Sequence, residues 1–297
     1  FSPHAIIKSV DEGLKLNFPE AISNERKLFE ECIQSPQRQG LIHSFFAERA
    51  NTKIPELKEG KPIELKKIGI IGGGTMGTGI SMAAMNAGLD VIMIEQNDEA
   101  IEKGKSKINA TYDRNVKLNR INNEQKLEIM SMFSATTDFN ELKDRDLIIE
   151  AVFENMDIKK EVFSKLNQIC RKNCILATNT SYLNVNEIAT VVDDPSRVIG
   201  LHFFSPANIM KLLEIVVAEK TSTDTVASAF DLAKKMRKVP VRSGVCDGFI
   251  GNRILSKYLV GTYHMVEDGA SPFHVDKVIR DFGCAMGIFQ VIDLAGG

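Results

Sequence analysis

The 297-residue sequence predicts an α/β fold with a doubly wound, mostly parallel sheet, preceded by a helical linker segment and followed by a partial all-helical C-terminal domain. Three observations support this prediction. Short β-branched runs alternate with amphipathic helical stretches from residue 66 onward, a glycine-rich motif follows the first run, and both ends of the chain have helical patterns. Strands that alternate with helices are typical of parallel sheets that carry helices on both faces.

The N-terminal residues 1–50 have a helical pattern, and we expect a helical segment too short for a core of its own. Ser2-Pro3 and Ser35-Pro36 each resemble an N-cap followed by proline in the first helical turn. Residues 51–65 are rich in Lys, Glu, Pro and Gly, which predicts a flexible linker.

The central residues 66–244 are expected to form the sheet domain, and residues 245–297 the partial helical domain. Strands are predicted at Lys67–Ile71, Val91–Ile94, Leu147–Ile149, Ile175–Ala177 and Val198–Leu201. Helices are predicted at Asp157–Cys170, Asp224–Met236, Ile250–Glu267 and Phe273–Asp281.

The composition excludes several classes of protein. The net charge of −2 and the pI near 6.3 argue against a nucleic-acid binder, which needs a basic surface. The five cysteines are scattered and have no zinc-site spacing with histidine, so we expect no metal site, reduced thiols and an intracellular compartment. The uncharged stretch Ile68–Leu89 imitates a membrane span, but its three consecutive glycines and its polar residues favour strand, turn and helix.

The glycine-rich motif runs from Gly72 to Gly77 and fits G-x-G-x-x-G after the first predicted strand. In a Rossmann-type site, Gly72 makes the tight turn, Gly74 lets the backbone approach a pyrophosphate, and Gly77 lets the helix pack on the strand. An acid, Glu95, stands at the end of the next strand, where a carboxylate accepts hydrogen bonds from ribose hydroxyls and repels a 2′-phosphate. The motif therefore predicts NAD rather than NADP as the cofactor.

Two ionisable residues in apolar surroundings predict a general base. His202 ends an apolar strand, and Glu214 interrupts an apolar run twelve residues later, where a carboxylate is costly to bury unpaired. A histidine paired with a carboxylate is the arrangement that general-base catalysis requires. A packed structural histidine is the alternative.

Polar residues such as Glu150, Glu154 and Lys159 follow the predicted strand at Leu147–Ile149, where they would face a ligand crevice at the carboxyl end of the sheet. An ordinary helix start is the alternative for these residues and for Asn252.

Five blocks of sequence then resemble the 3-hydroxyacyl-CoA dehydrogenase family, in the family order: GIIGGGTMGTGI, IIEAVFENMDIKKEVF, ATNTSYLNV, IGLHFFSPANIMKLLEI and DGFIGNRIL. The match runs from Lys66 to Gly297 and is closer to the dehydrogenase part of multifunctional fatty-acid β-oxidation enzymes of the peroxisomal bifunctional type. Residues 1–50 resemble the end of the hydratase/isomerase portion of those enzymes. The hydratase glutamates would lie upstream of Phe1, so we expect no hydratase activity from this chain.

The resemblance implies NAD-dependent oxidation of L-3-hydroxyacyl-CoA to 3-oxoacyl-CoA, with His202 as the general base and Glu214 as the carboxylate that orients it. It also implies that Ser181 and Asn252 hold the substrate's 3-oxygen and the histidine. The implied cofactor-binding positions are Gly72, Gly74, Thr75, Met76, Gly77, Glu95, Gln96, Ala151, Glu154, Lys159 and Ser205.

Two other functions remain possible from the sequence: a non-catalytic NAD-binding or scaffold module, and an oxidoreductase for another 3-hydroxy acid. The resemblance favours a peroxisomal location, with the mitochondrial matrix second. It also implies that the chain is cut at both ends. We therefore expect uncovered apolar helix faces in the C-terminal region, self-association through them, and reduced activity on acyl-CoA.

Overall fold

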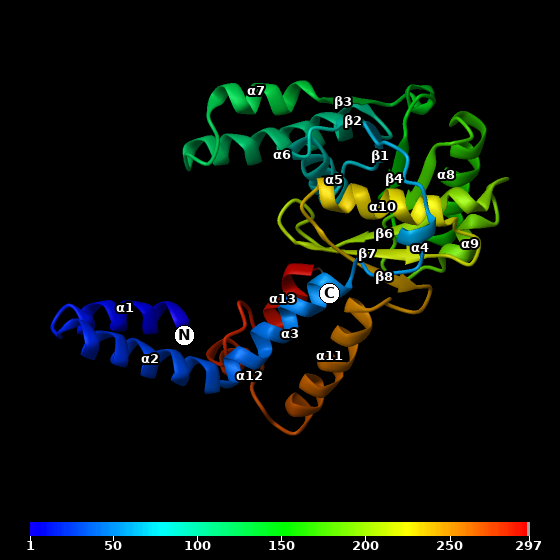
Figure 1. Ribbon diagram of the computed structural model, residues 1–297. Coiled ribbons are helices and arrows are strands. Elements are labelled where there is room, and N and C mark those ends of the chain that lie inside the picture. The colour runs from blue at the N-terminus through cyan, green and yellow to red at the C-terminus, as the bar shows by residue number, and fades with distance from the viewer. Residues whose placement is uncertain (296–297) are drawn as a thin grey trace. The chain divides into compact units, whose positions relative to one another are not determined.

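The computed structural model describes residues 1–295 and is shown in Figure 1. The chain divides into two compact units, Phe1–Lys53 and Ile54–Gly297. The fold class predicted from the sequence is confirmed, since N-terminal helices, a mostly parallel sheet with helices on both faces, and C-terminal helices are all present.

The first unit consists of three helices: α1 (Ser2–Gly13), α2 (Phe18–Gln34) and α3 (Pro36–Ala50). The predicted N-cap at Ser35 is confirmed, because its hydroxyl oxygen accepts the amide of Arg38 at 3.3 Å. The predicted N-cap at Ser2 is wrong: α1 begins at Ser2 itself, and Phe1 before it makes no side-chain capping bond. Pro3 is tolerated one position further into the helix because the first-turn amides have no intrahelical partner.

The second unit is built on one eight-stranded sheet in the order β3-β2-β1-β4-β5-β6-β7-β8. Neighbouring strands from β3 to β6 are parallel, β7 runs antiparallel to β6, and β8 is parallel to β7. The strands are β1 (Lys67–Ile71), β2 (Asp90–Ile94), β3 (Phe133–Thr136), β4 (Leu147–Glu150), β5 (Ile175–Thr178), β6 (Val198–Phe203), β7 (Leu212–Val217) and β8 (Val239–Gly244).

Helices cover both faces of this sheet (Figure 1). They are α5 (Thr75–Asn86), α6 (Asp98–Lys117), α7 (Asn123–Ser131), α8 (Met156–Ile169), α9 (Val185–Ala189) and α10 (Thr223–Lys235), with 3-10 turns at Phe139–Leu142 and Pro195–Arg197. Alternate residues of a strand point to opposite faces. In β1, Ile70 packs with α5 and α10 in one core, whereas Ile71 lies in the other core with α8 and α9.

The segment expected to be a flexible linker, residues 51–65, is largely anchored to the second unit. It contains the short helix α4 (Glu56–Glu59), which packs on α10. The Glu56 carboxylate pairs with Arg242 of β8 at 2.6 Å, and the amides of Lys61 and Ile63 donate to side chains of α10 at 2.7 and 3.0 Å. Side chains on α10 and β8 therefore provide partners that the composition of the segment did not reveal.

Three C-terminal helices follow the sheet: α11 (Gly251–Glu267), α12 (Pro272–Phe282) and α13 (Ile288–Ala295). The buried carboxylate of Asp276 in α12 accepts the amides of Phe289 and Gln290 at 2.9 and 3.1 Å and so caps the start of α13. Within the described residues, none of the helices combines the length and the hydropathy that crossing a membrane requires.

Candidate active site

His202 and Glu214 form a buried pair across two antiparallel strands. They stand directly opposite each other in the β6–β7 register, and Nδ1 of the histidine lies 2.7 Å from Oε2 of the glutamate. His202 is 4% exposed and Glu214 is fully buried. A carboxylate only accepts hydrogen bonds, so Nδ1 carries the proton and Nε2 remains the basic nitrogen of the neutral ring. The arrangement can therefore take up a proton at Nε2.

The second oxygen of Glu214 contacts the start of the helical region. Oε1 accepts the amides of Gly251 at 2.7 Å and Ile250 at 3.1 Å, so one carboxylate holds both the histidine and the first turn of α11. Asn252 lies in that same turn. These contacts could not be predicted from the sequence, because backbone amides donate whatever the residue type.

Two phenylalanine rings pack on the histidine. The Phe204 ring centroid lies 4.5 Å from that of His202, and the Phe249 centroid lies 5.6 Å away. These rings leave the imidazole little freedom to rotate, so the ring is positioned by packing as well as by its carboxylate.

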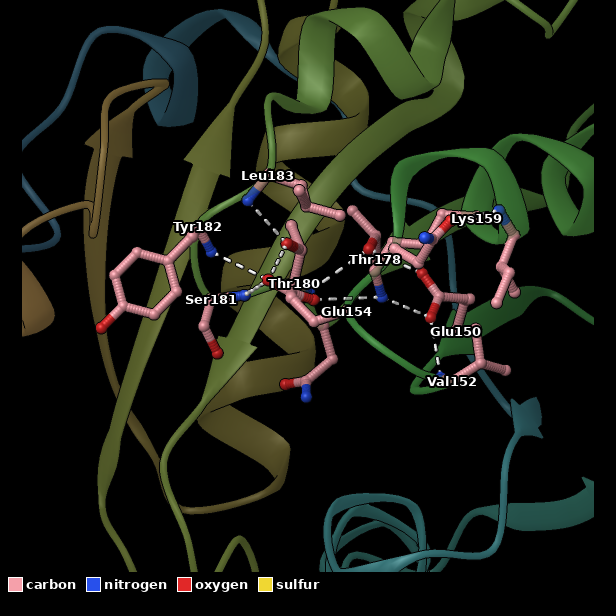
Figure 2. A network of polar contacts seen from close by, with 12 residues as sticks. Glu150, Val152, Glu154, Lys159, Thr178, Thr180, Ser181, Tyr182 and Leu183 are labelled. Carbon is pink, nitrogen blue, oxygen red and sulfur yellow. Dashed lines mark hydrogen bonds and ion pairs between the residues drawn. The ribbon is translucent and has the colours of Figure 1, made fainter. Parts of the chain in front are cut away.

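Glu154 holds the loop that contains Ser181, as Figure 2 shows. Its Oε1 accepts the Thr180 hydroxyl at 2.5 Å and the amides of Ser181 and Tyr182 at 2.7 and 3.0 Å. Asn179, which directly precedes Thr180, accepts the amide of Phe203 at 2.9 Å through its side-chain oxygen. The Ser181 loop is thereby fixed to the segment after β4 and also to the end of β6, one residue beyond His202.

Lys159 lies beneath this loop and is 1% exposed. Its ammonium donates to Glu150 at 2.7 Å and lies 3.5 Å from Glu154 (Figure 2). Glu150 is also fully buried and accepts the Thr178 hydroxyl and the Val152 amide at 2.7 and 2.8 Å. We expected the polar residues after β4 to face the ligand crevice, but here Lys159 and Glu150 lie in the interior, because each satisfies the other's charge.

The pKa of Glu154 reflects opposing effects. Partial burial raises it, but the hydrogen bond from Thr180, the charge of Lys159 and the two loop amides outweigh burial, so the net pKa lies below the ordinary carboxyl value. Glu154 is therefore a carboxylate at neutral pH.

The glycine motif forms a tight turn between β1 and α5. Gly72 has a φ of +97°, which favours glycine, and a Cβ on Gly77 would lie 1.7 Å from the Gly72 carbonyl oxygen. A Cβ on Gly74 would meet nothing within 4 Å, and no side chain caps the start of α5. This turn leaves both space and helix N-terminal amides for a phosphate group.

The Glu95 carboxylate lies beside the glycine turn at the end of β2. Oε1 accepts the Gly73 amide, and Oε2 accepts the amide of Gln96 at 3.0 Å. Lys107 of α6 was not among the residues predicted from the sequence, but its ammonium donates to the Thr75 hydroxyl at 3.1 Å in the first turn of α5. This contact joins residues 32 positions apart, so no local sequence pattern could have indicated it.

The remaining predicted residues lie around these groups. The amide of Ala151 donates to Ile71 at 2.8 Å, and its carbonyl would contact a Cβ on Gly72 at 2.7 Å. Met76 lies half-buried in the first turn of α5, and Ser205 is exposed two residues beyond the end of β6.

A cavity of about 710 Å³ brings the Ser181 loop and α11 together. Tyr182, adjacent to Ser181, lines it with Asn252, Arg253, Leu259 and Tyr263 of α11. Among the residues that the structure describes, no group of three or more His, Cys, Asp and Glu side chains could hold a metal ion.

Comparisons with known families identify two matching domains. Residues 67–246 match the NAD-binding domain of 3-hydroxyacyl-CoA dehydrogenase, and residues 248–297 match its C-terminal domain. The (S)-3-hydroxybutyryl-CoA dehydrogenase of Ralstonia eutropha superimposes with a TM-score of 0.75 at 31% identity, over 78% of this chain and 83% of that chain. The dehydrogenase part of multifunctional enzyme 1 from C. elegans gives a TM-score of 0.62 at 32% identity, over 80% of this chain and 57% of that one.

Longer relatives match nearly the whole chain. The peroxisomal fatty acid beta-oxidation multifunctional protein of Oryza sativa subsp. japonica is 38% identical over 294 residues, which are 98% of this chain and 40% of the relative. The peroxisomal bifunctional enzyme of Danio rerio is 39% identical over 99% of this chain and 41% of its own length. The chain thus spans about two fifths of these relatives. With both domain models matched in order over the sheet and the helices that follow it, the chain belongs to the 3-hydroxyacyl-CoA dehydrogenase family.

Proposed function

We propose that this chain oxidises L-3-hydroxyacyl-CoA to 3-oxoacyl-CoA with NAD, as a step of fatty-acid β-oxidation. The observation that carries the proposal is the buried His202–Glu214 pair, 2.7 Å apart, at the end of β6. It combines a base and its orienting carboxylate in a domain of an NAD-binding family.

The residues of the glycine turn fit NAD. The space at Gly74 and the first-turn amides of Thr75, Met76 and Gly77 suit the pyrophosphate, with Lys107 beside Thr75 as a further cation. Glu95 suits the ribose hydroxyls, with Gln96 next to it. Ala151, Glu154 and Ser205 are assigned to the nicotinamide half. Lys159 acts indirectly by holding Glu150 and Glu154. Bound NAD supplies a hydride acceptor.

The proton leaves through His202. In the neutral imidazole Nδ1 donates to Glu214, so Nε2 is free to accept the proton of the substrate's 3-hydroxyl. Glu214 stabilises the imidazolium that forms and keeps the ring from turning. Ser181 and Asn252 hold the substrate's 3-oxygen, and Glu154 fixes the loop that presents Ser181.

The remaining assignments follow the relatives. Acyl-CoA is the proposed substrate, and the cavity lined by Tyr182 and Asn252 is its proposed entry to the site. The peroxisome is the proposed location, since the named relatives are peroxisomal multifunctional enzymes. We also assign self-association to the C-terminal helices, whose exposed apolar residues include Ile254, Phe273 and Phe282.

The decisive experiment measures NADH oxidation with acetoacetyl-CoA for the parent chain and for His202→Gln. We expect His202→Gln to reduce turnover by roughly 10²–10⁴-fold, the usual contribution of a general base, with NADH affinity nearly unchanged. NADH fluorescence gives that affinity directly, because the chain contains no Trp to interfere.

Each alternative to the proposed function predicts a different result in these assays. If His202→Gln turns over as fast as the parent chain, His202 has only a packing role. An NADH signal that stays constant when acetoacetyl-CoA is added to the parent chain supports a non-catalytic NAD-binding module. Turnover on free acetoacetate at the same rate indicates an oxidoreductase for another 3-hydroxy acid.

A further inference from the structure

Two buried cysteines take no part in the mechanism above. Cys170 ends α8 and is 7% exposed, and Cys174 directly precedes β5 and is fully buried. Both pack in the same apolar core, and the exposed residues 171–173 connect them in a turn that the Cys174 amide closes on the Arg171 carbonyl at 3.0 Å. The pair lies at the amino end of β5, whereas His202 lies near the carboxyl end of the neighbouring parallel strand β6.

The guanidinium of Arg197 is buried against this turn and is only 7% exposed. It donates to the carbonyl oxygens of Arg171 at 3.0 Å and Cys174 at 3.2 Å, and to the side-chain oxygen of Asn167 at 2.9 Å. Its buried Nε has no hydrogen-bond partner, and within residues 1–295 no carboxylate forms an ion pair with it. Because neutral acceptors do not balance a buried charge, an anion close to this guanidinium would be stabilised.

A thiolate at Cys170 is the anion that this arrangement favours. The neighbouring Cys174 thiol lowers the pKa of Cys170, burial opposes that effect, and the charge of Arg197 lowers the pKa further, so the net value lies below that of an ordinary thiol. Cys170 and burial both raise the pKa of Cys174. The two sulfurs therefore differ in character: Cys170 is the one that loses its proton, and Cys174 remains a thiol beside it.

The other polar contacts of the two sulfurs are weak. Sγ of Cys170 lies 3.9 Å from the Leu142 carbonyl oxygen, and Sγ of Cys174 lies 3.5 Å from that of Ile175. A thiol is a poor hydrogen-bond donor at such distances. Neither contact therefore competes strongly with the interaction between the sulfurs.

A thiolate beside a thiol is the arrangement that peroxides convert into a disulfide. We propose that Cys170 and Cys174 form a site of reversible oxidation by hydroperoxides, with Cys170 as the attacking sulfur and Cys174 as the resolving sulfur.

The chemistry balances in two steps. The Cys170 thiolate attacks one peroxide oxygen, the O–O bond breaks, and the departing alkoxide takes up a proton, which leaves a sulfenic acid on Cys170 and an alcohol, or water from hydrogen peroxide. The Cys174 sulfur then attacks the Cys170 sulfur, the S–O bond breaks, and the hydroxide leaves as water with the thiol proton. The two thiols lose two electrons, which the peroxide gains, and a dithiol reductant reverses the reaction.

The test treats the reduced parent chain with stoichiometric hydrogen peroxide and then alkylates it with iodoacetamide. Trypsin cleaves after Arg171 and Lys172, so Cys170 and Cys174 fall on separate peptides unless a disulfide joins them. We expect the joined pair, with neither sulfur alkylated, and its loss after dithiothreitol. Cys284 is exposed and serves as the internal control, which should remain a thiol and be alkylated.

Variants separate the roles of the two sulfurs and of the cation. Cys174→Ser should stop at the sulfenic acid, which dimedone captures on Cys170, whereas Cys170→Ser should leave Cys174 alkylated. Arg197→Met should slow disulfide formation roughly 10–100-fold, as for one lost charge-assisted interaction, and Arg197→Lys should restore most of the rate. The matched control, Lys172→Gln, removes a charge from the exposed turn and should leave the rate unchanged. Far-UV circular dichroism checks that each variant folds.

Other outcomes overturn the proposal. Separate, alkylated peptides for both cysteines in peroxide-treated parent chain reject it without reference to any variant. A joined pair that forms no faster in the folded chain than in urea shows that the folded arrangement does not promote the reaction. A dimedone adduct on Cys174 in Cys170→Ser, with none on Cys170 in Cys174→Ser, contradicts the assigned roles. An Arg197→Met rate equal to the parent's removes the guanidinium from the reaction.

Discussion

At the scale of single residues, we expect Glu95 to determine the preference for NAD over NADP. Its carboxylate lies at the end of β2 beside Gly73. Glu95→Ala should weaken NAD binding by about 1.5–3 kcal/mol for each hydrogen bond lost to the ribose, and should narrow the difference from NADP by removing a repulsive charge. Calorimetry with both dinucleotides measures this, and Glu95→Gln separates lost charge from lost hydrogen bonding. An NAD affinity equal to the parent's contradicts the assignment.

Glu154 gives the molecule an acid-dependent contribution to stability. Its pKa in the folded chain lies below its unfolded value, so the folded state binds fewer protons in that range and stability rises with pH there. The contribution is complete above the ordinary carboxyl pKa and is lost as the pH falls through the lower, folded value. Urea unfolding of Glu154→Gln should show lower stability than the parent at pH 7, and a difference that shrinks on acidification.

The matched control is Glu161→Gln, because Glu161 is an exposed glutamate within α8, close in sequence to Glu154. A stability difference for Glu154→Gln that stays constant from pH 7 into the acid range would show that the hydrogen-bond geometry, and not the charge, holds the Ser181 loop.

At the scale of elements, the buried parallel strands could be predicted from their regular apolar pattern, whereas elements that depend on tertiary packing could not. Strands β1, β2, β4, β5 and β6 were found within a few residues, because buried parallel strands are continuous β-branched runs. Strands β3, β7 and β8 were missed. Strands β3 and β8 are the two edge strands and are only partly buried, and the apolar run of β7 is interrupted by Glu214.

The residues of the candidate site likewise differ in whether the sequence alone could identify them. Glu214 could be singled out because a carboxylate in an apolar run needs a partner, and His202 is the residue opposite it. The amides of Ile250 and Gly251 and the ammonium of Lys107 could not, because their roles come from long-range packing.

The turn between β1 and α5 contains two glycines with different surroundings, Gly74 in open space and Gly77 against the Gly72 carbonyl. Gly77→Ala forces a Cβ against the Gly72 carbonyl and should reduce the free energy of unfolding by about 1–3 kcal/mol or more. Gly74→Ala enters open space, so its unfolding should match the parent's while its NAD affinity falls. Thermal unfolding and calorimetry on the pair check this, and a Gly74→Ala chain that binds NAD normally would show that the phosphates lie elsewhere.

At the scale of the whole molecule, the exposed apolar residues of the helical region predict association between copies of the chain. Phe273 and Phe282 of α12 are 87% and 88% exposed, and such surface tends to be buried by a partner. Sedimentation velocity should show a concentration-dependent increase in mass that Phe282→Asp reduces. Leu127→Asp on α7, where the leucine is 69% exposed, is the matched control and should leave association unchanged. A parent chain that is monomeric at all concentrations contradicts the prediction.

Glu214 finally links alignment of the base to docking of the helical region. One carboxylate holds Nδ1 of His202 through one oxygen and the amides of Ile250 and Gly251 through the other. If α11 swings away, that buried carboxylate loses two donors and becomes free to reorient, so the imidazole loses its anchor at the same moment. Opening of the cavity between the Ser181 loop and α11 and loss of the imidazole's orientation would then be a single event, so we expect proton transfer only while α11 is docked. Hydrogen exchange at the amides of Ile250 and Gly251 would report directly how often the enzyme is ready to react.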